Sequence, residues 1–386
     1  MKVALVTGSR SEFYLLKNLI LRLQESKKFK LNLIVTGSHI SKFFGNTIND
    51  IKKEKIKVSD KVNILIKGDK EKDISKSISI GIKSFSKIFN KYKPNLLIIL
   101  GDRYEIFSAA IAASINKVPI AHIHGGERTE GVIDEGIRHS ITKLSHLHFV
   151  STKTYLKRVQ QLGENKKYIF NVGSLGVEAI KNEKLYLKKE IERILKINFN
   201  KKNVLVTYHP ETLERRSTNK NNFIKLLKTL KKLKNTTIIF TMPNADMDFK
   251  IILKEIKKFV SSHKNAFFFK SLGHKKYFTL CKNVDLMIGN SSSGIIEMPS
   301  FKKATLNVGD RQRGRVKAQS IIDINNDTDK IFKSINYSYS KKFKNVLDKV
   351  KNPYDGGKTS NKILKILKKI KLNNIVKKSF FDYKFQ

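Results

Sequence analysis

The stretch that most constrains the fold of this chain is Leu96–Leu100, five consecutive apolar residues that end at Gly101. A short apolar run without polar alternation is typical of a parallel strand that is buried on both faces. Ile106, Ala109 and Ala113 then recur at helical spacing, so we expect a helix directly after the strand. A buried strand that leads straight into a helix favours an α/β fold, in which helices cover both faces of a parallel sheet.

The same alternation of strand and helix runs through both halves of the 386-residue chain. The strands expected in the first half are Met1–Thr7, Leu31–Thr36, Val62–Ile66, Leu96–Leu100, Ile120–Ile123, Phe149–Ser151 and Ile169–Val172. Those expected in the second half are Val204–Tyr208, Ile238–Thr241, Ala266–Phe269, Val284–Ile288 and Ala304–Val308. Because one core stops growing at roughly 250–300 residues, we expect two doubly wound, Rossmann-like domains, residues 1–175 and 176–358, followed by a C-terminal helix and tail, residues 359–386.

Charged side chains follow two of the expected strand ends and open the next helix. Asp102 follows one strand, His124 and Glu127 follow the next, and Asp134 is placed at the N-cap of a helix. That helix adds further polar residues: Glu135, Arg138 and His139. Ligands of open parallel sheets bind just outside the carboxyl ends of the strands, so we expect a reaction site at this rim.

The net charge of +45 raises the question of a nucleic-acid partner. The 66 lysines are spread in doublets along the expected helices and form no stripe interleaved with aromatic residues. Nucleic-acid-binding modules tend to cluster their basic residues and to carry a recognisable motif, so we expect no nucleic-acid partner. Half of the 12 arginines lie in motifs where forked, planar donors suit anion binding: Arg10, Arg103, Arg138, Arg311, Arg313 and Arg315.

Composition also bears on the compartment. The single cysteine, Cys281, can form no internal disulfide, which suits a reducing cytoplasm. No apolar run approaches the roughly 18–20 residues that a membrane span needs, and Val3–Thr7 is too short for a signal-peptide core. We therefore expect a cytoplasmic protein with no membrane partner.

Two turns have the composition of anion-binding loops. Gly8-Ser9-Arg10 joins a strand to a helix, and the serine loop, Asn290–Gly294, joins the strand Val284–Ile288 to a short helix. Free backbone N–H groups and hydroxyls at such turns can bind phosphate. His209 follows another strand end, where it could bind or protonate a leaving group, and Arg311 lies in a segment with three arginines.

Cofactor and metal motifs are missing from the sequence. The first strand is not followed by the G-x-G-x-x-G dinucleotide fingerprint, so we infer no NAD. His122 and His124, like His146 and His148, alternate as strand residues do and show no H-E-x-x-H spacing. We expect neither a metal nor a cofactor, although metal binding by these histidines remains the rival interpretation.

Six sequence blocks, in order, carry a resemblance to a known family: GDRYEIFSAAIAAS from Gly101, HIHGGE from His122, DEGIRHSITKLSHLH from Asp134, HPETL from His209, GNSSSG from Gly289 and GDRQRGR from Gly309. Together they resemble the hydrolysing UDP-N-acetylglucosamine 2-epimerases of bacterial sialic acid synthesis, over residues 1 to about 355. The resemblance implies a GT-B-type fold with a cleft between two domains. It also implies that the C-terminal helix returns to the first domain, and that the protein is a homo-oligomer, a dimer or tetramer.

The resemblance also implies a substrate and residue roles. UDP is eliminated across C1–C2 of the sugar to give 2-acetamidoglucal, and water then adds with inversion at C2. The acid–base residues implied are Asp102, His124, Glu127, Asp134 and His209. The substrate-binding residues implied are Arg10, Arg103, Asn290, Ser291, Ser292, Ser293, Gly294, Glu297 and Arg311, with the serine loop on the diphosphate and Glu297 on the ribose hydroxyls.

The sequence departs from many hydrolysing relatives at His124, where they carry an acidic residue. Either His124 or Glu127 takes over that carboxylate's role, and both alternatives stay open at this stage. Three functions remain: a hydrolysing epimerase that releases N-acetylmannosamine and UDP, a related hydrolase of a nucleotide-linked 2,4-diacetamido-trideoxy sugar for legionaminic-type acids, and a GT-B glycosyltransferase. The first is the main expectation.

Overall fold

The computed structural model describes residues 1–66 and 68–383, which divide into two compact units. Unit 1 comprises residues 1–127, 134–179 and the described residues from 354 onward. Unit 2 comprises residues 128–133 and 180–353. The domain limits expected from the sequence were 175/176 and 358/359; in the structure the chain leaves unit 1 after Ala179 and returns to it at Tyr354.

Unit 1 is built on a seven-stranded sheet in which neighbouring strands are parallel, in the order β3-β2-β1-β4-β5-β6-β7. The strands are β1 (Lys2–Thr7), β2 (Lys30–Thr36), β3 (Asp60–Val62), β4 (Leu96–Leu100), β5 (Ile120–Ile123), β6 (Leu147–Val150) and β7 (Ile169–Asn171). The helices of this unit are α1 (Arg10–Glu25), η1 (Gly37–Ile40), α2 (Ile48–Lys53), α3 (Glu71–Tyr92), α4 (Tyr104–Ile115), α5 (Asp134–Leu144), α6 (Lys153–Gln161), η2 (Lys166–Tyr168) and α15 (Thr359–Lys369). Helix α7 (Leu175–Asn182) begins in unit 1.

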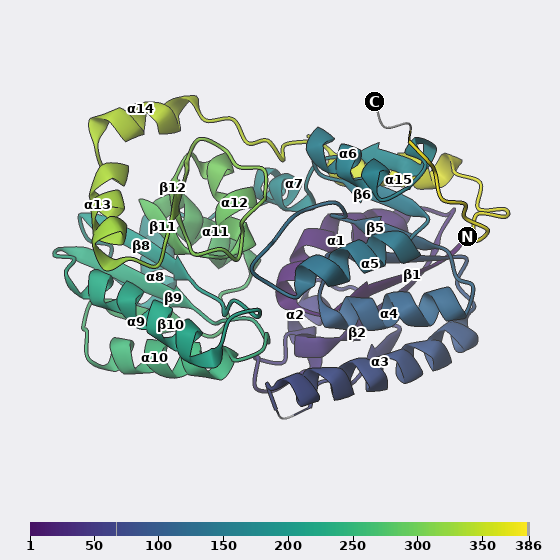
Figure 1. The fold of residues 1–386 in the computed structure, drawn as a ribbon, viewed down its shortest axis with the longest axis horizontal. Coiled ribbons are helices and arrows are strands. Elements are labelled where there is room, and N and C mark those ends of the chain that lie inside the picture. The colour runs from purple at the N-terminus through teal and green to yellow at the C-terminus, as the bar shows by residue number, and fades with distance from the viewer. Residues whose placement is uncertain (67, 384–386) are drawn as a thin grey trace. The chain divides into compact units, whose positions relative to one another are not determined.

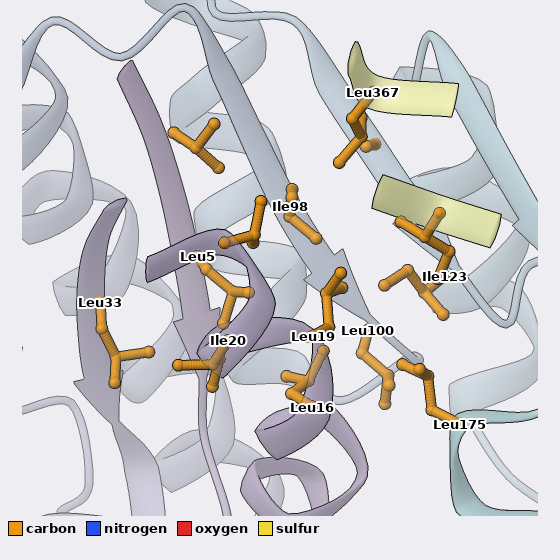
Figure 2. Close-up of a cluster of buried hydrophobic side chains, with 14 of the residues drawn as sticks. Leu5, Leu16, Leu19, Ile20, Leu33, Ile98, Leu100, Ile123, Leu175 and Leu367 are labelled. Carbon is orange, nitrogen blue, oxygen red and sulfur yellow. The ribbon is translucent and has the colours of Figure 1, made fainter. Parts of the chain in front are cut away.

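The central strands are buried on both faces because successive side chains enter different cores. Leu96, Ile98 and Leu100 of β4 pack with α1 and α15, as Figure 2 shows for Ile98 and Leu100 beside Leu16, Leu19 and Leu367. Leu97 and Ile99 enter the opposite core, which α3, α4 and α5 cover. In Figure 1, α3 and α4 run side by side along that face. The continuous apolar run of β4 thus corresponds to a strand that helices cover on both faces, as expected.

Unit 2 repeats the architecture with a six-stranded parallel sheet in the order β10-β9-β8-β11-β12-β13. Its strands are β8 (Lys202–Thr207), β9 (Thr236–Thr241), β10 (Ala266–Phe269), β11 (Leu286–Gly289), β12 (Ala304–Val308) and β13 (Ile321–Ile324). Its helices are α8 (Lys188–Leu195), α9 (Arg216–Lys231), α10 (Phe249–Ser261), α11 (His274–Asn283), α12 (Ser292–Ile296), η3 (Met298–Phe301), α13 (Thr328–Ser338) and α14 (Lys341–Lys349). Across the described part of the chain, no helix is both long enough and apolar enough to cross a membrane.

Both sheets reverse their strand order once, and the loops of interest lie at the reversals. In unit 1 the order turns between β1 and β4, which are followed by the loops carrying Arg10 and Asp102. In unit 2 it turns between β8 and β11, which are followed by His209 and the serine loop. Ligands of doubly wound sheets bind at such switch points, because the two loops diverge there and leave a crevice.

The structure corrects two strands of the sequence analysis. The strand expected at Val62–Ile66 is only Asp60–Val62, although Ile64 is also buried. Apolar alternation indicates burial, whereas a strand also needs backbone hydrogen bonds to its neighbour. The pairing of β2 with β3 extends only over Asp60–Val62. Strand β13 was not predicted because Asp323 interrupts its apolar run; it pairs with β12 at the edge of the sheet.

The packing of β4 predicts the stability of unit 1. We expect Ile98→Ala to lower the free energy of unfolding by about 2–5 kcal/mol, because Ile98 is fully buried and truncation leaves a cavity between the sheet and its helices. The matched control is Ile115→Ala at the end of α4, where the side chain is 69% exposed and the effect should stay within about 0.5 kcal/mol. Urea unfolding followed by circular dichroism measures both; equal effects of the two substitutions would contradict the packing described here.

Candidate active site

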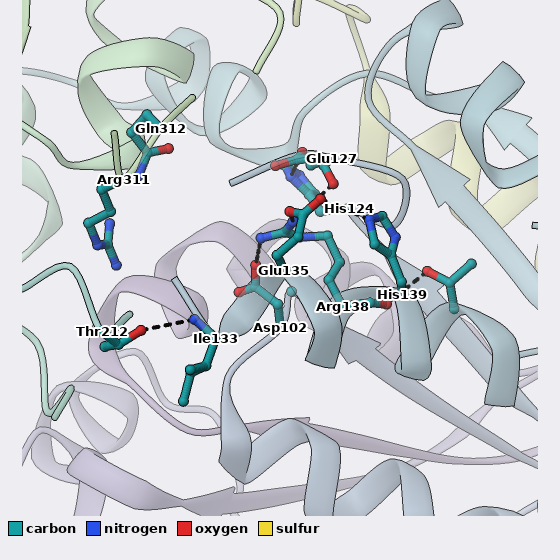
Figure 3. Close-up of polar contacts among 12 residues, drawn as sticks. Asp102, His124, Glu127, Ile133, Glu135, Arg138, His139, Thr212, Arg311 and Gln312 are labelled. Carbon is teal, nitrogen blue, oxygen red and sulfur yellow. Dashed lines mark hydrogen bonds and ion pairs between the residues drawn. The ribbon is translucent and has the colours of Figure 1, made fainter. Parts of the chain in front are cut away.

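The guanidinium of Arg138 is the centre of the polar cluster in unit 1. Arg138 lies on α5 and is 1% exposed, so its charge needs partners inside the protein. It forms an ion pair with Asp102 at the end of β4, donates to Glu135 Oε2 at 2.7 Å and donates to the Glu127 carbonyl oxygen at 2.9 Å. Figure 3 shows these groups converging on Arg138. One buried cation thus ties the end of β4 to the loop after β5 and to α5.

His124 and Glu127 form a buried hydrogen-bonded pair in the loop after β5. His124 Nδ1 lies 2.8 Å from Glu127 Oε1, which also accepts a hydrogen bond from Ser151 Oγ at 3.1 Å. A carboxylate only accepts, so we assign the proton to Nδ1, which leaves Nε2 with a lone pair in the neutral ring. Among the described residues, the buried Nε2 has no hydrogen-bond partner. The arrangement can hold a proton acceptor ready for a reacting group.

The backbone at His124 supports a special role for this residue. Its φ is +69°, in the left-handed region that residues other than glycine seldom occupy. Such conformations persist where surrounding contacts over-determine them, often at functional sites. Its backbone N–H donates to the carbonyl of Phe149 at the end of β6, at 3.0 Å, and its side chain is held by Glu127. The loop after β5 therefore fixes the direction of the imidazole.

Helix α5 brings further ionisable groups to the same end of the sheet. Asp134 is the first residue of α5, whereas the sequence analysis expected it to be the N-cap, the residue just before the helix. Glu135 Oε1 lies 3.0 Å from His139 Nε2, while its other oxygen accepts from Arg138. Asp102, His124, Glu127 and Asp134 therefore belong to one end of one sheet, around Arg138 and the start of α5, which is the placement that the sequence predicts.

Arg103 is committed to carboxylates of its own unit. Its Nε lies 3.3 Å from Glu105 Oε2 and 3.8 Å from Glu12 Oε1, and its side chain is 13% exposed. Burial, and then the neighbouring Glu105, raise the pKa of Glu12 to about 7, while Arg103 opposes that rise. Glu12 also accepts the Gly8 N–H at 2.7 Å. Arg103 thus pairs with two carboxylates of unit 1, and the direct substrate contact expected from the sequence stays a prediction.

Arg10 differs from Arg103, because its Nη1 is buried and has no hydrogen-bond partner in the described part of the chain. Burial lowers the pKa of its guanidinium, and the nearby Asp50 opposes that shift. A buried arginine nitrogen without a partner carries a large desolvation cost unless an anion binds it. This geometry is compatible with the substrate-binding role expected for Arg10.

In unit 2, His209 and Asn290 hold the two strand ends of the switch point together. Asn290 Oδ1 accepts the His209 N–H and Asn290 Nδ2 donates to the His209 carbonyl, both at 2.8 Å. The Asn290 side chain is therefore occupied by these two hydrogen bonds, and its contact with substrate stays a prediction. The backbone N–H of Asn244 donates to His209 Nδ1 at 3.1 Å, so in the neutral ring the proton is on Nε2. In the neutral ring, His209 therefore offers an N–H donor at Nε2, whereas His124 offers a lone pair at Nε2.

The three hydroxyls of the serine loop are in different situations. Ser291 is the N-cap of α12, and its Oγ accepts the Ser293 N–H at 3.4 Å. Ser293 Oγ is hydrogen-bonded to the phenol of Tyr277, a residue that no motif singled out. Ser292 Oγ makes no hydrogen bond with any described residue. Gly294 is buried against Thr305, where an added Cβ would lie 2.7 Å from a methyl carbon, so a side chain would displace the loop.

Arg311 lies against the serine loop, as expected. Its Nη1 donates to the Asn290 carbonyl at 3.2 Å and its Nη2 lies 3.4 Å from Asp246. Glu211 accepts the Asp310 N–H at 3.0 Å and fixes the loop that carries Arg311. This loop requires Gly309, whose φ is +81° and whose added Cβ would lie 2.1 Å from a Glu211 oxygen. Glu297, at the end of α12, donates its N–H to the Ser293 carbonyl at 2.9 Å.

The histidines considered as metal ligands are engaged in protein contacts. His122 bonds the Gly101 carbonyl and Thr142, and burial lowers its pKa to about 3. His148 lies 3.0 Å from Glu164, and His146 accepts the Ile120 N–H at 3.1 Å. Within the ranges described, the structure contains no group of three or more His, Cys, Asp or Glu residues placed to hold a metal ion.

Comparison with known proteins identifies the family. A family model described as UDP-N-acetylglucosamine 2-epimerase matches residues 21–368. The chain belongs to the UDP-N-acetylglucosamine 2-epimerase family. Among individual relatives, a Campylobacter jejuni protein named GDP/UDP-N,N'-diacetylbacillosamine 2-epimerase (hydrolyzing) is 45% identical over 386 residues, covering 99% of each chain. The Escherichia coli polysialic acid biosynthesis protein P7 is 41% identical over 384 residues, covering 99% of this chain and 97% of that protein.

Solved epimerase structures share the fold. The Neisseria meningitidis UDP-GlcNAc 2-epimerase bound to UDP-GlcNAc has a TM-score of 0.79 at 21% identity, covering 96% of this chain and all of that one. The Methanocaldococcus jannaschii UDP-GlcNAc 2-epimerase in complex with UDP-GlcNAc and UDP also has a TM-score of 0.79, at 20% identity, covering 95% and 99%. These likenesses confirm the expected α/β fold with two doubly wound sheets, of the GT-B-like epimerase type.

Several supporting residues of this family member were missed by the sequence analysis. Ser151 follows β6 and Tyr277 lies within α11, and each touches a predicted site residue only through the tertiary fold. Asp246 and Gln312 likewise contact Arg311 and the Asn290 carbonyl. Ser151 carried one usable signal, its position after a strand at the same end of the sheet as Glu127. Tyr277 carried none, because helix periodicity does not say which buried tyrosine holds a hydroxyl.

The raised pKa of Glu12 predicts how stability depends on pH. The folded pKa of about 7 exceeds the ordinary 4.5, so this contribution to stability is present below about pH 4.5 and is lost as pH rises through about 7. We expect Glu12→Gln, which is neutral and can still accept the Gly8 N–H, to lose less stability than the unsubstituted protein between about pH 5 and 8. Thermal unfolding across this range measures the effect, with Glu25→Gln at the exposed end of α1 as control. Parallel pH curves for Glu12→Gln and the unsubstituted protein would refute the assignment.

Proposed function

We propose that this chain is a hydrolysing 2-epimerase that acts on a nucleotide-linked 2,4-diacetamido-trideoxy sugar and releases the free sugar and the nucleoside diphosphate. The observation that carries the substrate is the 45% identity, along essentially the whole chain, to the Campylobacter jejuni protein named for diacetylbacillosamine. A Legionella pneumophila protein named UDP-N,N'-diacetylbacillosamine 2-epimerase (hydrolyzing) is a further relative, 33% identical over 375 residues. The substrate that was the alternative in the sequence analysis is thus the better supported.

The second candidate is hydrolysis of UDP-N-acetylglucosamine to N-acetylmannosamine and UDP. The 41% identity to the polysialic acid biosynthesis protein P7 favours it, because N-acetylmannosamine is the precursor that sialic acid synthesis needs. Both candidates share the chemistry at C1 and C2 and differ only at the sugar positions beyond. A glycosyltransferase reading is less well supported, since glycosyl transfer has no use for an acid–base cluster of this size.

The reaction has two balanced steps. A base removes the proton from C2 while the bond from C1 to the diphosphate oxygen breaks, which forms a C1=C2 double bond. Water then adds across that double bond: the hydroxyl goes to C1 and a proton goes to C2 from the opposite side, so the configuration at C2 is inverted. Each step requires a correctly placed acid or base, which contributes about 10²–10⁴-fold to the rate.

We assign the proton transfers at C1 and C2 to unit 1. Asp102 is held by Arg138 through Oδ2, and its Oδ1 has no hydrogen-bond partner in the described ranges, so that oxygen can accept the C2 proton. His124 offers the lone pair of Nε2, and Glu127 stabilises the imidazolium that forms when this nitrogen takes a proton. Of the two alternatives left open by the sequence, the hydrogen bond between the two side chains supports a role for His124 at the reacting atoms, with Glu127 acting through it. Asp134, at the start of α5, remains a candidate for the second proton transfer.

Nucleotide binding is assigned to unit 2. Ser292 and Ser293 offer hydroxyls to the diphosphate, and Arg311 provides the nearby positive charge. His209 Nε2–H can donate to the leaving diphosphate oxygen as the bond to C1 breaks. Glu297 is placed at the end of the same short helix, where it can accept from ribose hydroxyls. In unit 1, the buried Nη1 of Arg10 is a further candidate donor to an anionic group of the substrate.

The first test concerns the reaction. In D2O we expect the released sugar to carry deuterium at C2, because the original proton is removed and solvent supplies its replacement. Asp102→Asn should lower turnover by about 10²–10⁴-fold while UDP affinity changes little, since the amide keeps the shape but cannot act as a base. NMR of the products, with UDP-N,N'-diacetylbacillosamine and UDP-N-acetylglucosamine compared as substrates, measures isotope position and substrate preference together. Product without deuterium at C2 would sink the elimination–hydration mechanism, and a higher kcat/KM for UDP-N-acetylglucosamine would decide for the second candidate.

The second test concerns the pair His124–Glu127. We expect His124→Asn and Glu127→Gln each to reduce kcat, and the double variant to be no slower than His124→Asn alone, because Glu127 acts through the imidazole. Asparagine replaces His124 because it tolerates the left-handed backbone at φ +69° better than alanine does. Steady-state rates of the three variants form the cycle. Additive losses would show that Glu127 contacts the substrate independently.

A further inference from the structure

A tyrosine on a different helix is hydrogen-bonded to the serine loop of unit 2. Tyr277 lies on α11, and its phenol oxygen is hydrogen-bonded to Ser293 Oγ in the first turn of α12. The two residues are 16 positions apart and lie on different helices, so the tertiary fold brings them together. Neighbouring Ser291 spends its hydroxyl on capping α12, so Ser293 is the loop serine that another side chain orients.

The surroundings of Tyr277 keep its hydroxyl in the donor form. Burial raises the pKa of the phenol well above its usual value, and Cys281 and Glu297 raise it further. Cys281 lies one turn along the same helix, and burial together with Glu297 raises the pKa of its thiol as well, so neither group adds a negative charge next to the loop. The raised pKa favours the protonated form of the phenol, which can donate a hydrogen bond.

A hydroxyl has one proton to donate and can accept two, so the direction of the Tyr277–Ser293 bond matters. If the phenol donates to Ser293 Oγ, the proton of Ser293 is free for another acceptor. Among the described residues, Ser293 Oγ also lies 4.0 Å from Met287 Sδ, and a thioether is a weak acceptor. An anionic phosphate oxygen is a far stronger one, and a chain of donors that ends on an anion is strengthened by polarisation.

We propose that Tyr277 is a positioning residue for nucleotide binding: it donates to Ser293 Oγ and so directs the Ser293 hydroxyl proton toward an oxygen of the bound diphosphate. The inference rests on the proposed function, because it takes the serine loop as the diphosphate site. It adds a residue from outside every motif, and it gives Ser293 a role distinct from those of Ser291 and Ser292. Tyr277 itself does not touch the nucleotide.

The test is a double-mutant cycle on UDP binding, measured by titration calorimetry. We expect Tyr277→Phe to raise the Kd for UDP about 3–10-fold, the size of one net hydrogen bond, because the ring stays and only the donor is lost. Ser293→Ala should raise it at least as much, and the double variant should equal Ser293→Ala alone, because the phenol acts only through that hydroxyl. Tyr339→Phe is the matched control: it removes a buried phenol of unit 2 whose oxygen has no hydrogen-bond partner among the described residues.

Three outcomes overturn the inference, and they can be told apart from a failure of the proposed function. An unchanged Kd in Tyr277→Phe, while the unsubstituted protein binds UDP and hydrolyses its substrate, removes Tyr277 and leaves the function intact. A loss of affinity in Tyr277→Phe that persists undiminished in the Ser293→Ala background shows a merely structural role, as does an equal loss in Tyr339→Phe. If the unsubstituted protein does not bind UDP at all, the proposed function fails and the inference with it.

Discussion

The structure of the acid–base cluster depends on one buried cation. Arg138 is almost fully enclosed and yet charged, a state that a protein can tolerate only when every donor has a partner. Its partners come from three separate segments: the end of β4, the loop after β5 and α5 itself. Loss of any one would leave a buried guanidinium donor without its acceptor, so Arg138 holds the three segments together. The rigidity that acid–base chemistry needs thus follows from the cost of burying a guanidinium.

A second layer of contacts, made by neighbouring polar groups, fixes the orientation of the candidate site residues. The two histidines placed for chemistry are oriented in opposite senses by their Nδ1 partners: a carboxylate at His124, which accepts, and a backbone N–H at His209, which donates. In the neutral ring, the partner of Nδ1 therefore determines whether Nε2 offers a lone pair, as at His124, or an N–H group, as at His209. Asn290 and Glu211 act in the same way on the loops of unit 2, because they spend their side chains on backbone groups. Ser151 and Tyr277 extend this layer to residues outside the motifs.

The large positive charge is separate from this machinery. Most lysines are exposed, whereas three arginines of the motifs have largely buried side chains that pair with carboxylates: Arg103 with Glu105, Arg138 with Asp102 and Arg311 with Asp246. Forked guanidinium groups can satisfy several acceptors at once, which an ammonium cannot do in a fixed geometry. Composition alone suggests a polyanion-binding surface, but the contacts show that the residues with structural consequences are the few arginines inside the two units.

The sequence by itself determined the fold class and which candidate site residues of unit 1 lie together. Apolar runs such as Leu96–Leu100 report burial directly, and glycine and charged residues after them mark strand ends, so the two sheets and the rim of Asp102, His124 and Glu127 could be predicted. What it left open were the strands at sheet edges, because pairing with a neighbour leaves no mark in the hydrophobic pattern. Only the tertiary structure decided that Arg103 pairs with Glu105, that Asn290 hydrogen-bonds the backbone of His209, and that Glu127 hydrogen-bonds the ring of His124. A side chain's role depends on the few ångströms that separate it from groups far away in the chain, and those distances are set by packing.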